Sequence, residues 1–194
     1  MGNKNDKIPL DTYNQLQRCT SFSNKQMNKW YKTFNKCCPE GRMTMDQFQK
    51  VYRYFFTEGD STEFAKHVFR TFDKNQDGTI DFKEFMCGLS ITKYGSREQK
   101  LMWAFNMTDI DSSGEIVKDE LETVIRAMYQ LMGHDCEGEV LSENGNSTKL
   151  PAANELADHL FKKIDINSDG QITLDEFLGV AATDADILSL FQQA

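Results

Sequence analysis

The chain has 194 residues, of which 30 are acidic and 22 are Lys or Arg, so its net charge is −8 and its pI is about 4.9. This acidic balance argues against nucleic-acid binding, which needs clustered positive charge. Hydrophobic residues form 39% of the chain and 14 residues are Phe, so the composition favours a folded protein over an acidic disordered tail.

Targeting signals and catalytic motifs do not stand out in the sequence. No stretch approaches the roughly 18 apolar residues of a membrane span, and the N-terminus lacks the apolar segment of a secretory signal. We therefore expect a cytoplasmic protein whose cysteines are reduced thiols. These are Cys19, Cys37, Cys38, Cys87 and Cys136. No nucleophile with a base, phosphate loop or catalytic carboxylate pair is apparent, so we do not expect an enzyme.

The first helix that the sequence predicts begins at a capping box. Ser23 and Gln26 have the spacing at which each side chain bonds the backbone N–H of the other. Apolar residues then recur at helical spacing, which predicts an amphipathic helix. The same spacing predicts two further helix starts, at Asp60-x-x-Glu63 and Ser96-x-x-Gln99.

Residues 36–47 are the first of four copies of one twelve-residue pattern, and this copy is degenerate. The other copies carry oxygen-bearing side chains at positions 1, 3, 5 and 12 and a glycine at position 6. Here Gly41 keeps position 6, but Lys36, Cys38 and Gln47 stand at positions 1, 3 and 12. Pro39 also stiffens the loop. We expect this copy to be structural and to bind no metal.

Residues 73–84 form the first intact copy, DKNQDGTIDFKE. Ca²⁺ takes about six to eight oxygens, which an EF-hand loop supplies from positions 1, 3, 5, 7, 9 and 12, with a glycine at position 6 for the turn. The predicted ligands are Asp73, Asn75, Asp77, Glu84 and the backbone carbonyl of Thr79. A glutamate at position 12 is long enough to bind the ion with both oxygens, which favours Ca²⁺.

Residues 109–120 form the second intact copy, DIDSSGEIVKDE. Its predicted ligands are Asp109, Asp111, Ser113, Glu120 and the backbone carbonyl of Glu115. Position 9 is a valine with no side-chain oxygen, so we expect a water molecule to complete the site there.

Residues 165–176 form the last copy, DINSDGQITLDE. Its predicted ligands are Asp165, Asn167, Asp169, Glu176 and the backbone carbonyl of Gln171. A polar insert at residues 133–150, rich in Gly, Asn and Ser, lengthens the chain before this copy, and we expect it to be a flexible surface loop.

Apolar residues at position 8 of every loop predict short strands that join the loops in pairs. The expected fold is all-α, with four EF-hands, each a helix–loop–helix unit, paired into two lobes by short β-bridges. We expect the N-terminal lobe at residues 1–95 and the C-terminal lobe at 96–194. Three loops should hold Ca²⁺, with Mg²⁺ an alternative ion at low Ca²⁺.

Several runs of the chain resemble the neuronal calcium sensor family, and within it the visinin-like and hippocalcin branch. These runs are KWYKTF at 29–34, the Cys38-Pro39 pair, FFTEGDSTEFAKHVFRTFD at 55–73, DGTIDFKEF at 77–85 and EQKLMWAF at 98–105. The resemblance is strong over about residues 8–132. The insert and the short C-terminus, LSLFQQA, depart from the family.

The resemblance implies a Ca²⁺-myristoyl switch, in which an N-terminal acyl chain is held inside at low Ca²⁺ and extruded at high Ca²⁺. Gly2 would be the acylated residue once Met1 is removed. The motif has Ser or Thr at residue 6, whereas this chain has Asp6. One acyl chain anchors a protein only marginally, so Lys4 and Lys7 would assist a reversible association with an anionic membrane.

The resemblance also implies a target groove in the N-terminal lobe. The residues that line up with it are Trp30, Tyr52, Phe55, Phe56, Phe85 and Leu89. In a sensor, Ca²⁺ opens such a groove for an amphipathic helix of a protein target. The alternative interpretation of each residue is ordinary core packing.

The leading hypothesis is therefore a calcium sensor that regulates signalling or membrane-associated targets. A cytosolic calcium buffer, whose hands barely open, is one alternative. A dedicated calcium-binding regulatory subunit of an enzyme is another.

Overall fold

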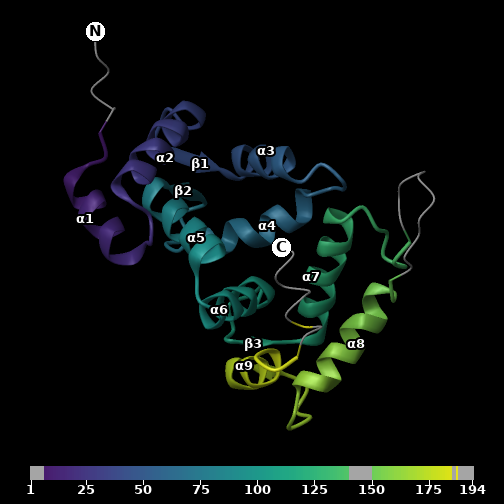
Figure 1. Ribbon diagram of the computed structural model, residues 1–194. Helices are drawn as coiled ribbons and strands as arrows, with labels where there is room; N and C mark the ends of the chain where they lie inside the picture. The colour runs from purple at the N-terminus through teal and green to yellow at the C-terminus, as the bar shows by residue number, and fades with distance from the viewer. Residues whose placement is uncertain (1–6, 140–149, 185–186, 188–194) are drawn as a thin grey trace.

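A computed structural model of the chain describes residues 7–139, 150–184 and 187. Within them the chain is mainly helical (Figure 1). The elements up to the second hand are α1 Leu10–Cys19, α2 Asn24–Cys37, β1 Arg42–Thr44, α3 Met45–Phe55, α4 Thr62–Phe72, β2 Thr79–Asp81 and α5 Phe82–Tyr94. Those that follow are α6 Arg97–Thr108, β3 Glu115–Ile116, α7 Lys118–Leu131, α8 Ala153–Ile164, β4 Ile172–Thr173 and α9 Leu174–Ala181.

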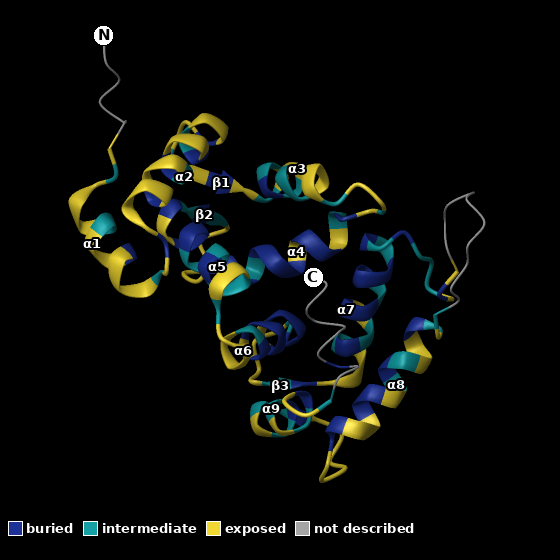
Figure 2. Cartoon of the chain, viewed as in Figure 1, coloured by how far each residue is buried: buried dark blue, intermediate teal, exposed yellow. Residues whose placement is uncertain are grey.

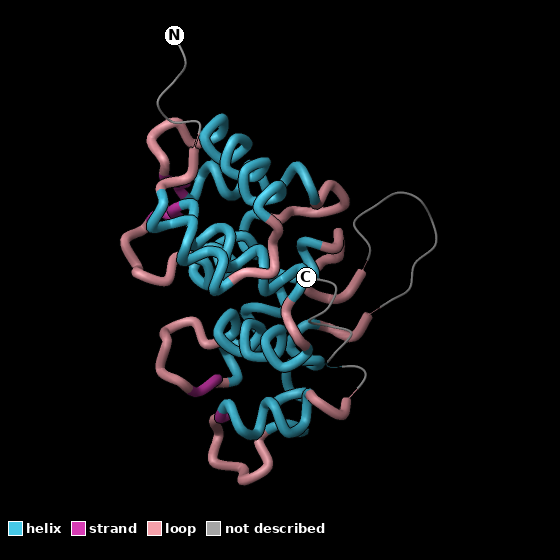
Figure 3. Tube along the Cα trace, turned by 60° about the vertical axis from the view of Figure 1, so that its left-hand side comes forward, coloured by secondary structure: helices cyan, strands magenta, loops and turns pink. Residues whose placement is uncertain are grey.

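Short antiparallel strands join the hands in pairs, as the sequence predicts. Strand β1 pairs with β2, placing Met43 opposite Ile80, and β3 pairs with β4, placing Ile116 opposite Ile172. All four are the apolar residues at position 8 of their loops, and all are buried. Figure 3 shows both strand pairs on the left-hand side of the molecule, one in its upper half and the other in its lower half. The predicted all-α EF-hand fold is confirmed.

The predicted helix starts agree with the structure except at one place. Capping boxes occur at Ser23 and Ser96, but α4 begins at Thr62 without a side-chain cap from Asp60 to Glu63. The backbone N–H of Asp60 instead donates to the carbonyl of Gln130, at 2.8 Å. The Asp60 N–H is therefore not available to the side chain of Glu63, and the Asp60 carboxylate accepts from the N–H of Thr62, at 2.9 Å.

Helix α1 was not predicted from the sequence. It packs against α5, and among its residues only Leu16 is buried. After α1, the ring of Phe22 lies edge-on to that of Tyr94 at the end of α5, with 5.1 Å between centroids. The N-terminal segment is therefore held along α5 by a few contacts rather than by a continuous apolar stripe.

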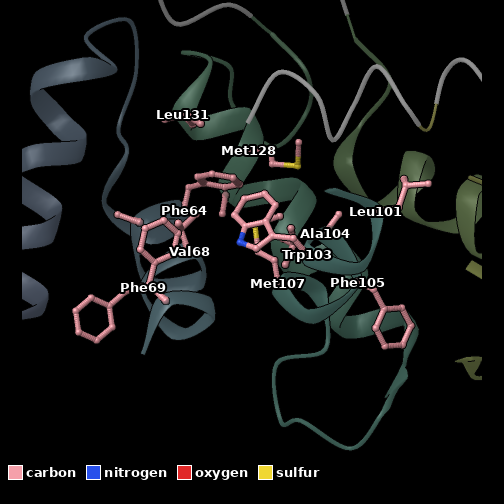
Figure 4. Close-up of a cluster of buried hydrophobic side chains, with 14 of the residues drawn as sticks. Phe64, Val68, Phe69, Leu101, Trp103, Ala104, Phe105, Met107, Met128 and Leu131 are labelled. Carbon is pink, nitrogen blue, oxygen red and sulfur yellow. The ribbon is translucent and has the colours of Figure 1, made fainter. Parts of the chain in front are cut away.

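One contiguous core runs through both pairs of hands. Figure 2 shows buried residues concentrated where α4, α6 and α7 face one another. Figure 4 shows Phe64 and Val68 of α4 beside Trp103 and Met107 of α6. The indole N–H of Trp103 donates to the hydroxyl of Thr71, at 2.9 Å, in this buried contact. No helix of the described residues is long and apolar enough to cross a membrane.

Backbone hydrogen bonds join the two described ends of the polar insert at 133–150. The N–H of Leu150 donates to the carbonyl of Gly138, and the N–H of Ala153 donates to that of Cys136. Residues 140–149, where the sequence predicts a flexible loop, lie outside the described residues.

Candidate metal centres

The loop at 73–84 turns its acidic side chains inward onto its own backbone. Glu84 accepts from the N–H groups of Lys74 and Asn75 with one carboxylate oxygen, and from Asp81 with the other. Asp73 accepts from the N–H groups of Asp77 and Gly78. Position 12 therefore reaches back to positions 2 and 3, so hydrogen bonds from Glu84 hold the two ends of the loop together.

The loops at 109–120 and 165–176 repeat this arrangement. Glu120 accepts from the N–H of Ile110 at 2.8 Å, and Glu176 accepts from that of Ile166 at 3.2 Å. At position 1 of each loop, the aspartate accepts from the glycine at position 6. Three independent segments thus adopt one hydrogen-bonding pattern because they share the same residue types at the same spacing.

The backbone reverses direction at position 6 of each loop in a conformation that suits glycine. Gly78, Gly114 and Gly170 have φ values of 81°, 88° and 87°, and a side chain at this φ would clash with the backbone. Position 7 follows the turn: Thr79 begins β2, Glu115 begins β3, and Gln171 is the residue just before β4. The backbone carbonyl of Glu115 accepts from the hydroxyl of Ser113 at 3.0 Å, so these two predicted ligands lie close together.

The donor set fits a hard divalent cation. One oxygen each from Asp109, Asp111 and Glu120 all lie within 4.8 Å of one another, and oxygens bound to one Ca²⁺ at about 2.3–2.6 Å lie at most about 5 Å apart. The position-1 aspartates Asp73, Asp109 and Asp165 are only 7%, 6% and 9% exposed. Buried carboxylates are stable when a cation or hydrogen bonds compensate them, so these loops suit Ca²⁺.

The remaining predicted side-chain ligands accept hydrogen bonds from backbone N–H groups of their own loops. Asn75 and Asn167 each accept from the N–H at position 5 through the side-chain oxygen, at 2.9 Å. At position 5 itself, Asp77 and Asp169 each accept from the N–H at position 7, at 3.0 Å. In the third loop, Asp111 accepts from the N–H of Ser113 at 2.9 Å.

In the degenerate first loop an amide replaces the position-12 carboxylate. Gln47 accepts from the N–H of Thr44 at 2.9 Å and donates to the carbonyl of Cys37 at 3.3 Å. Gly41 keeps a φ of 77°, so the turn survives. Cys38 is 1% exposed, and burial raises the pKa of its thiol to about 11. The Gln47 amide and the turn at Gly41 therefore keep the loop folded in place of a position-12 carboxylate.

One cation of the first loop reaches into the second. The guanidinium of Arg42, on β1, forms an ion pair with Asp77 and donates to the hydroxyl of Thr79 at 2.9 Å. Hydrogen bonds from the Thr79 hydroxyl and from Arg42 lower the pKa of Asp77 to about 2. Sequence spacing gave no signal of this contact, because it depends on the register of β1 against β2.

An apolar groove of about 450 Å³ lies between α2, α3 and the start of α5. Of the six predicted groove residues, Trp30, Phe55 and Phe85 line it. The rings of Trp30 and Phe85 meet edge-on with centroids 5.8 Å apart. Phe55 is 66% exposed. The other lining residues are Thr33, Phe34, Cys37, Met43, Gln47, Lys50, Val51 and Tyr54.

The other three predicted groove residues are not among those that line it. Tyr52 stacks on Phe56 with ring centroids 5.0 Å apart and also packs near Phe64 of α4. Leu89 is partly buried against the core. Tyr52 faces α4 because it is one position away from Val51 on α3, and one position turns a side chain by about 100°. The spacing of Gln47, Val51 and Tyr54 could have identified the groove face.

Gly2, the predicted acylation site, lies outside the described residues.

Comparisons with known proteins place the chain among EF-hand proteins. Residues 98–182 match the EF-hand domain pair family and residues 64–91 match the EF hand domain family. Human (Homo sapiens) recoverin is 36% identical over 193 residues, covering 99% of this chain and 94% of recoverin. Neuronal calcium sensor 1 of Lymnaea stagnalis is 37% identical over 188 residues, covering 97% of this chain and 94% of its own length.

S-modulin of Aquarana catesbeiana is 36% identical over 193 residues, covering 99% of this chain and 93% of its own length. Near-complete coverage at 36–37% identity shows that the similarity extends over the chain as a whole. The family consists of calcium sensors rather than enzymes, in agreement with the sequence-based expectation. The loops, their pairing and these relatives lead to one conclusion: the chain belongs to the neuronal calcium sensor family.

Proposed function

We propose that this chain senses Ca²⁺ through its second, third and fourth loops and then presents the apolar groove to a protein target. The ligands are the fifteen residues named for these loops, and Mg²⁺ occupies the loops when Ca²⁺ is low. The observation that carries the proposal is the adjacency of Glu84 and Phe85. Glu84 closes the second loop, and the next residue lines the groove.

This adjacency supplies a mechanical link between ion and groove. Glu84 is part of the capping box that starts α5, since its N–H donates to the side chain of Asp81 at 2.8 Å. A cation that draws the Glu84 carboxylate toward the loop centre must also reorient the first turn of α5. Phe85 moves with that turn, so its contacts with Trp30 and Phe34 change.

The chemistry of the groove defines the class of target. Its walls are aromatic and aliphatic, and Lys50 is a cationic residue on its lining. An amphipathic helix fits such a groove when its apolar residues recur at helical spacing. An acidic residue beside that apolar face would pair with Lys50.

Membrane association is part of the proposal. Acylation of Gly2 would give marginal binding on its own, and Lys4 and Lys7 would add attraction to an anionic surface. The protein would then be cytoplasmic with reversible attachment to membranes. Intact-mass measurement of protein purified from its native cell tests this: loss of Met1 with one C14 acyl group supports it, and an unmodified Gly2 removes it.

The sensor function is tested by Ca²⁺-dependent exposure of apolar surface. A hydrophobic dye should gain fluorescence when Ca²⁺ is added to the full chain, and an excess of chelator should reverse the gain. A calcium buffer would also bind the ion, but its dye fluorescence would be the same with and without Ca²⁺. Calorimetric titration in parallel should give a stoichiometry of three ions.

A further inference from the structure

Two cysteines that are far apart in the sequence meet in the folded chain. Cys19 is the last residue of α1 and Cys87 lies in α5, and their Sγ atoms are 3.1 Å apart. A disulfide has an S–S distance of about 2.0 Å, so an approach of about 1 Å separates the thiols from a bond. We propose that Cys19 and Cys87 are a reversible oxidation site, at which a peroxide forms a disulfide that joins α1 to α5.

The backbone around the pair is already in place for such a bond. The N–H of Ser21 donates to the hydroxyl of Ser90 at 3.2 Å, and the Phe22 and Tyr94 rings meet just beyond. These contacts lie one after another along α5 on the C-terminal side of Cys87. Because they hold the chain after α1 against α5 without a crosslink, rotation of the two cysteine side chains is the main movement that the disulfide requires.

The two thiols differ in a way that gives each a role. Cys19 is exposed, whereas Cys87 is only partly exposed. Burial, followed by the neighbouring Cys19, raises the pKa of Cys87 to about 12. Since the thiolate is the reactive form, Cys87 is a poor first nucleophile. Cys19 is therefore the sulfur that a peroxide in solution reaches first.

The oxidation then proceeds in two balanced steps. The Cys19 sulfur attacks one oxygen of hydrogen peroxide, which breaks the O–O bond, forms a sulfenic acid and releases water. The Cys87 sulfur attacks the Cys19 sulfur, so that the S–S bond forms and the S–O bond breaks. Hydroxide leaves and takes the thiol proton of Cys87 as a second water. A dithiol reductant reverses the reaction by thiol–disulfide exchange.

The two cysteines of the first hand are poorly suited to this chemistry. Cys37 and Cys38 are adjacent in the chain, and a disulfide between neighbours departs from the usual geometry. Cys38 is also buried, so peroxide has little access to it. The pair at Cys19 and Cys87 combines access with a partner sulfur in contact.

A disulfide here would restrain a helix that belongs to the second hand. Cys87 lies three residues after Glu84, about one helical turn along α5. In the oxidised protein α1 could not separate from α5, and any reorientation of α5 would carry α1 with it. This restraint concerns the N-terminal helix whether or not the loops hold an ion.

Peptide mapping tests the site directly. Reduced full-length protein in chelator is treated with a few equivalents of hydrogen peroxide, and remaining thiols are blocked before digestion. We expect an intact monomer about 2 Da lighter, a peptide pair linking Cys19 to Cys87, and loss of both signals on reduction. Cys19→Ser and Cys87→Ser should each abolish the linked pair, whereas Cys37→Ser should keep it.

Thermal unfolding provides a second readout. The crosslink spans a sequence separation of 68 residues, so it should raise the Tm of the oxidised protein by about 5 °C or more. Cys19→Ser, at an exposed position, should fold normally and show no such rise after peroxide. The proposal is overturned if Cys19 ends as an unpaired sulfinic acid, if it links to another cysteine or a second chain, or if Tm does not change when the linked peptide is present.

Discussion

At the residue scale, the ion pair between Arg42 and Asp77 connects the degenerate first loop to a loop whose predicted ligand set is intact. Arg42 stands at position 7 of the first loop, and its guanidinium binds a predicted Ca²⁺ ligand of the second. The degenerate copy therefore supplies a competing cation to its partner. This contact makes the second loop sensitive to a residue outside its own sequence.

Replacing Arg42 should strengthen Ca²⁺ binding at the second loop. In Arg42→Gln, no ion pair has to break before Asp77 can bind Ca²⁺. We expect the Ca²⁺ affinity of the second loop to rise about two- to fivefold, which matches the small free energy of an exposed ion pair. Calorimetric Ca²⁺ titration at low and high salt measures the change, and the gain should shrink as salt screens the pair. Arg53→Gln, on an exposed part of α3, is the control. Unchanged or weaker binding would contradict the competition.

His67 should make the stability of the protein depend on pH. Its side chain is buried, and among the described residues its Nδ1 has no hydrogen-bond partner. Burial, aided by the charge of Arg70, lowers the pKa of His67 to about 4. As the pH falls below about 6.5, the unfolded chain takes up a proton that the folded chain does not bind until the pH nears 4. Stability is therefore lost across that window.

The expected loss is about 2 kcal/mol of unfolding free energy between pH 7 and pH 5. Urea unfolding in chelator at both pH values measures it. His67→Leu should remove most of this pH dependence, whereas His159→Gln, at an exposed histidine, should keep it. An equal loss in the wild type and in His67→Leu would assign the effect to other groups.

At the element scale, the turn before α4 and the end of α7 are packed backbone against backbone. The N–H of Asp60 donates to Gln130, and a Cβ placed on Gly59 would lie 2.0 Å from the Gln130 carbonyl oxygen and 2.5 Å from the Gly133 nitrogen. Neither neighbour is a flexible side chain. Only glycine permits this approach.

Gly59→Ala should therefore destabilise the protein by about 1–3 kcal/mol, the usual cost of overpacking. Gly179→Ala in α9 is the matched control, because a Cβ there meets no atom within 4 Å. It should instead stabilise by about 0.5–1 kcal/mol through helix propensity. Thermal and urea unfolding distinguish the two. A neutral Gly59→Ala would mean that the two turns separate at little cost.

Elements specified by local chemistry could be predicted from the sequence, and those specified by tertiary contacts could not. The loops and the boxes at Ser23 and Ser96 depend on residues within twelve positions of one another. Helix α1 was not predicted because Leu16 is its one buried residue, so its sequence has no repeating apolar pattern at helical spacing. Three of the six predicted groove residues line the groove. The others could not be excluded from the sequence, because the face of α3 that meets the groove depends on how α3 packs on α4. The proximity of Cys19 and Cys87 has no local signal.

At the scale of the whole molecule, the two pairs of hands are joined through α4 and α6. The guanidinium of Arg70 donates to the carbonyl of Met107 at 2.7 Å and to that of Asp109 at 3.3 Å. Asp109 is position 1 of the third loop. The second hand thus holds the start of the third loop, while Trp103 and Thr71 anchor the same interface.

Arg70→Gln should weaken the coupling between the second and third loops. Without the guanidinium, the end of α6 loses two hydrogen bonds from α4, and filling one loop should no longer favour filling the other. We expect the Hill coefficient of Ca²⁺ binding to fall toward 1 and the apparent affinity to drop about fivefold, at the lower end of allosteric couplings. Calorimetric titration measures both, with Lys66→Gln on the exposed side of α4 as the control. A wild-type binding curve would show that the loops are coupled by another route.

In the proposed function, ion binding at the second loop governs exposure of the groove through Glu84 and Phe85. The most direct measurement is the Ca²⁺-dependent fluorescence of a hydrophobic dye with the wild-type chain and with Glu84→Gln. Removing a residue that only hydrogen-bonds to a metal ligand lowers metal affinity roughly 10–100-fold. Loss of the Glu84 carboxylate, itself a predicted ligand, should lower the Ca²⁺ affinity of the second loop at least that much. We expect a strong Ca²⁺-dependent dye signal in the wild type that is lost in Glu84→Gln at Ca²⁺ levels that still fill the third and fourth loops. An equal signal with and without Ca²⁺ in the wild type, or a full response in Glu84→Gln, would contradict it.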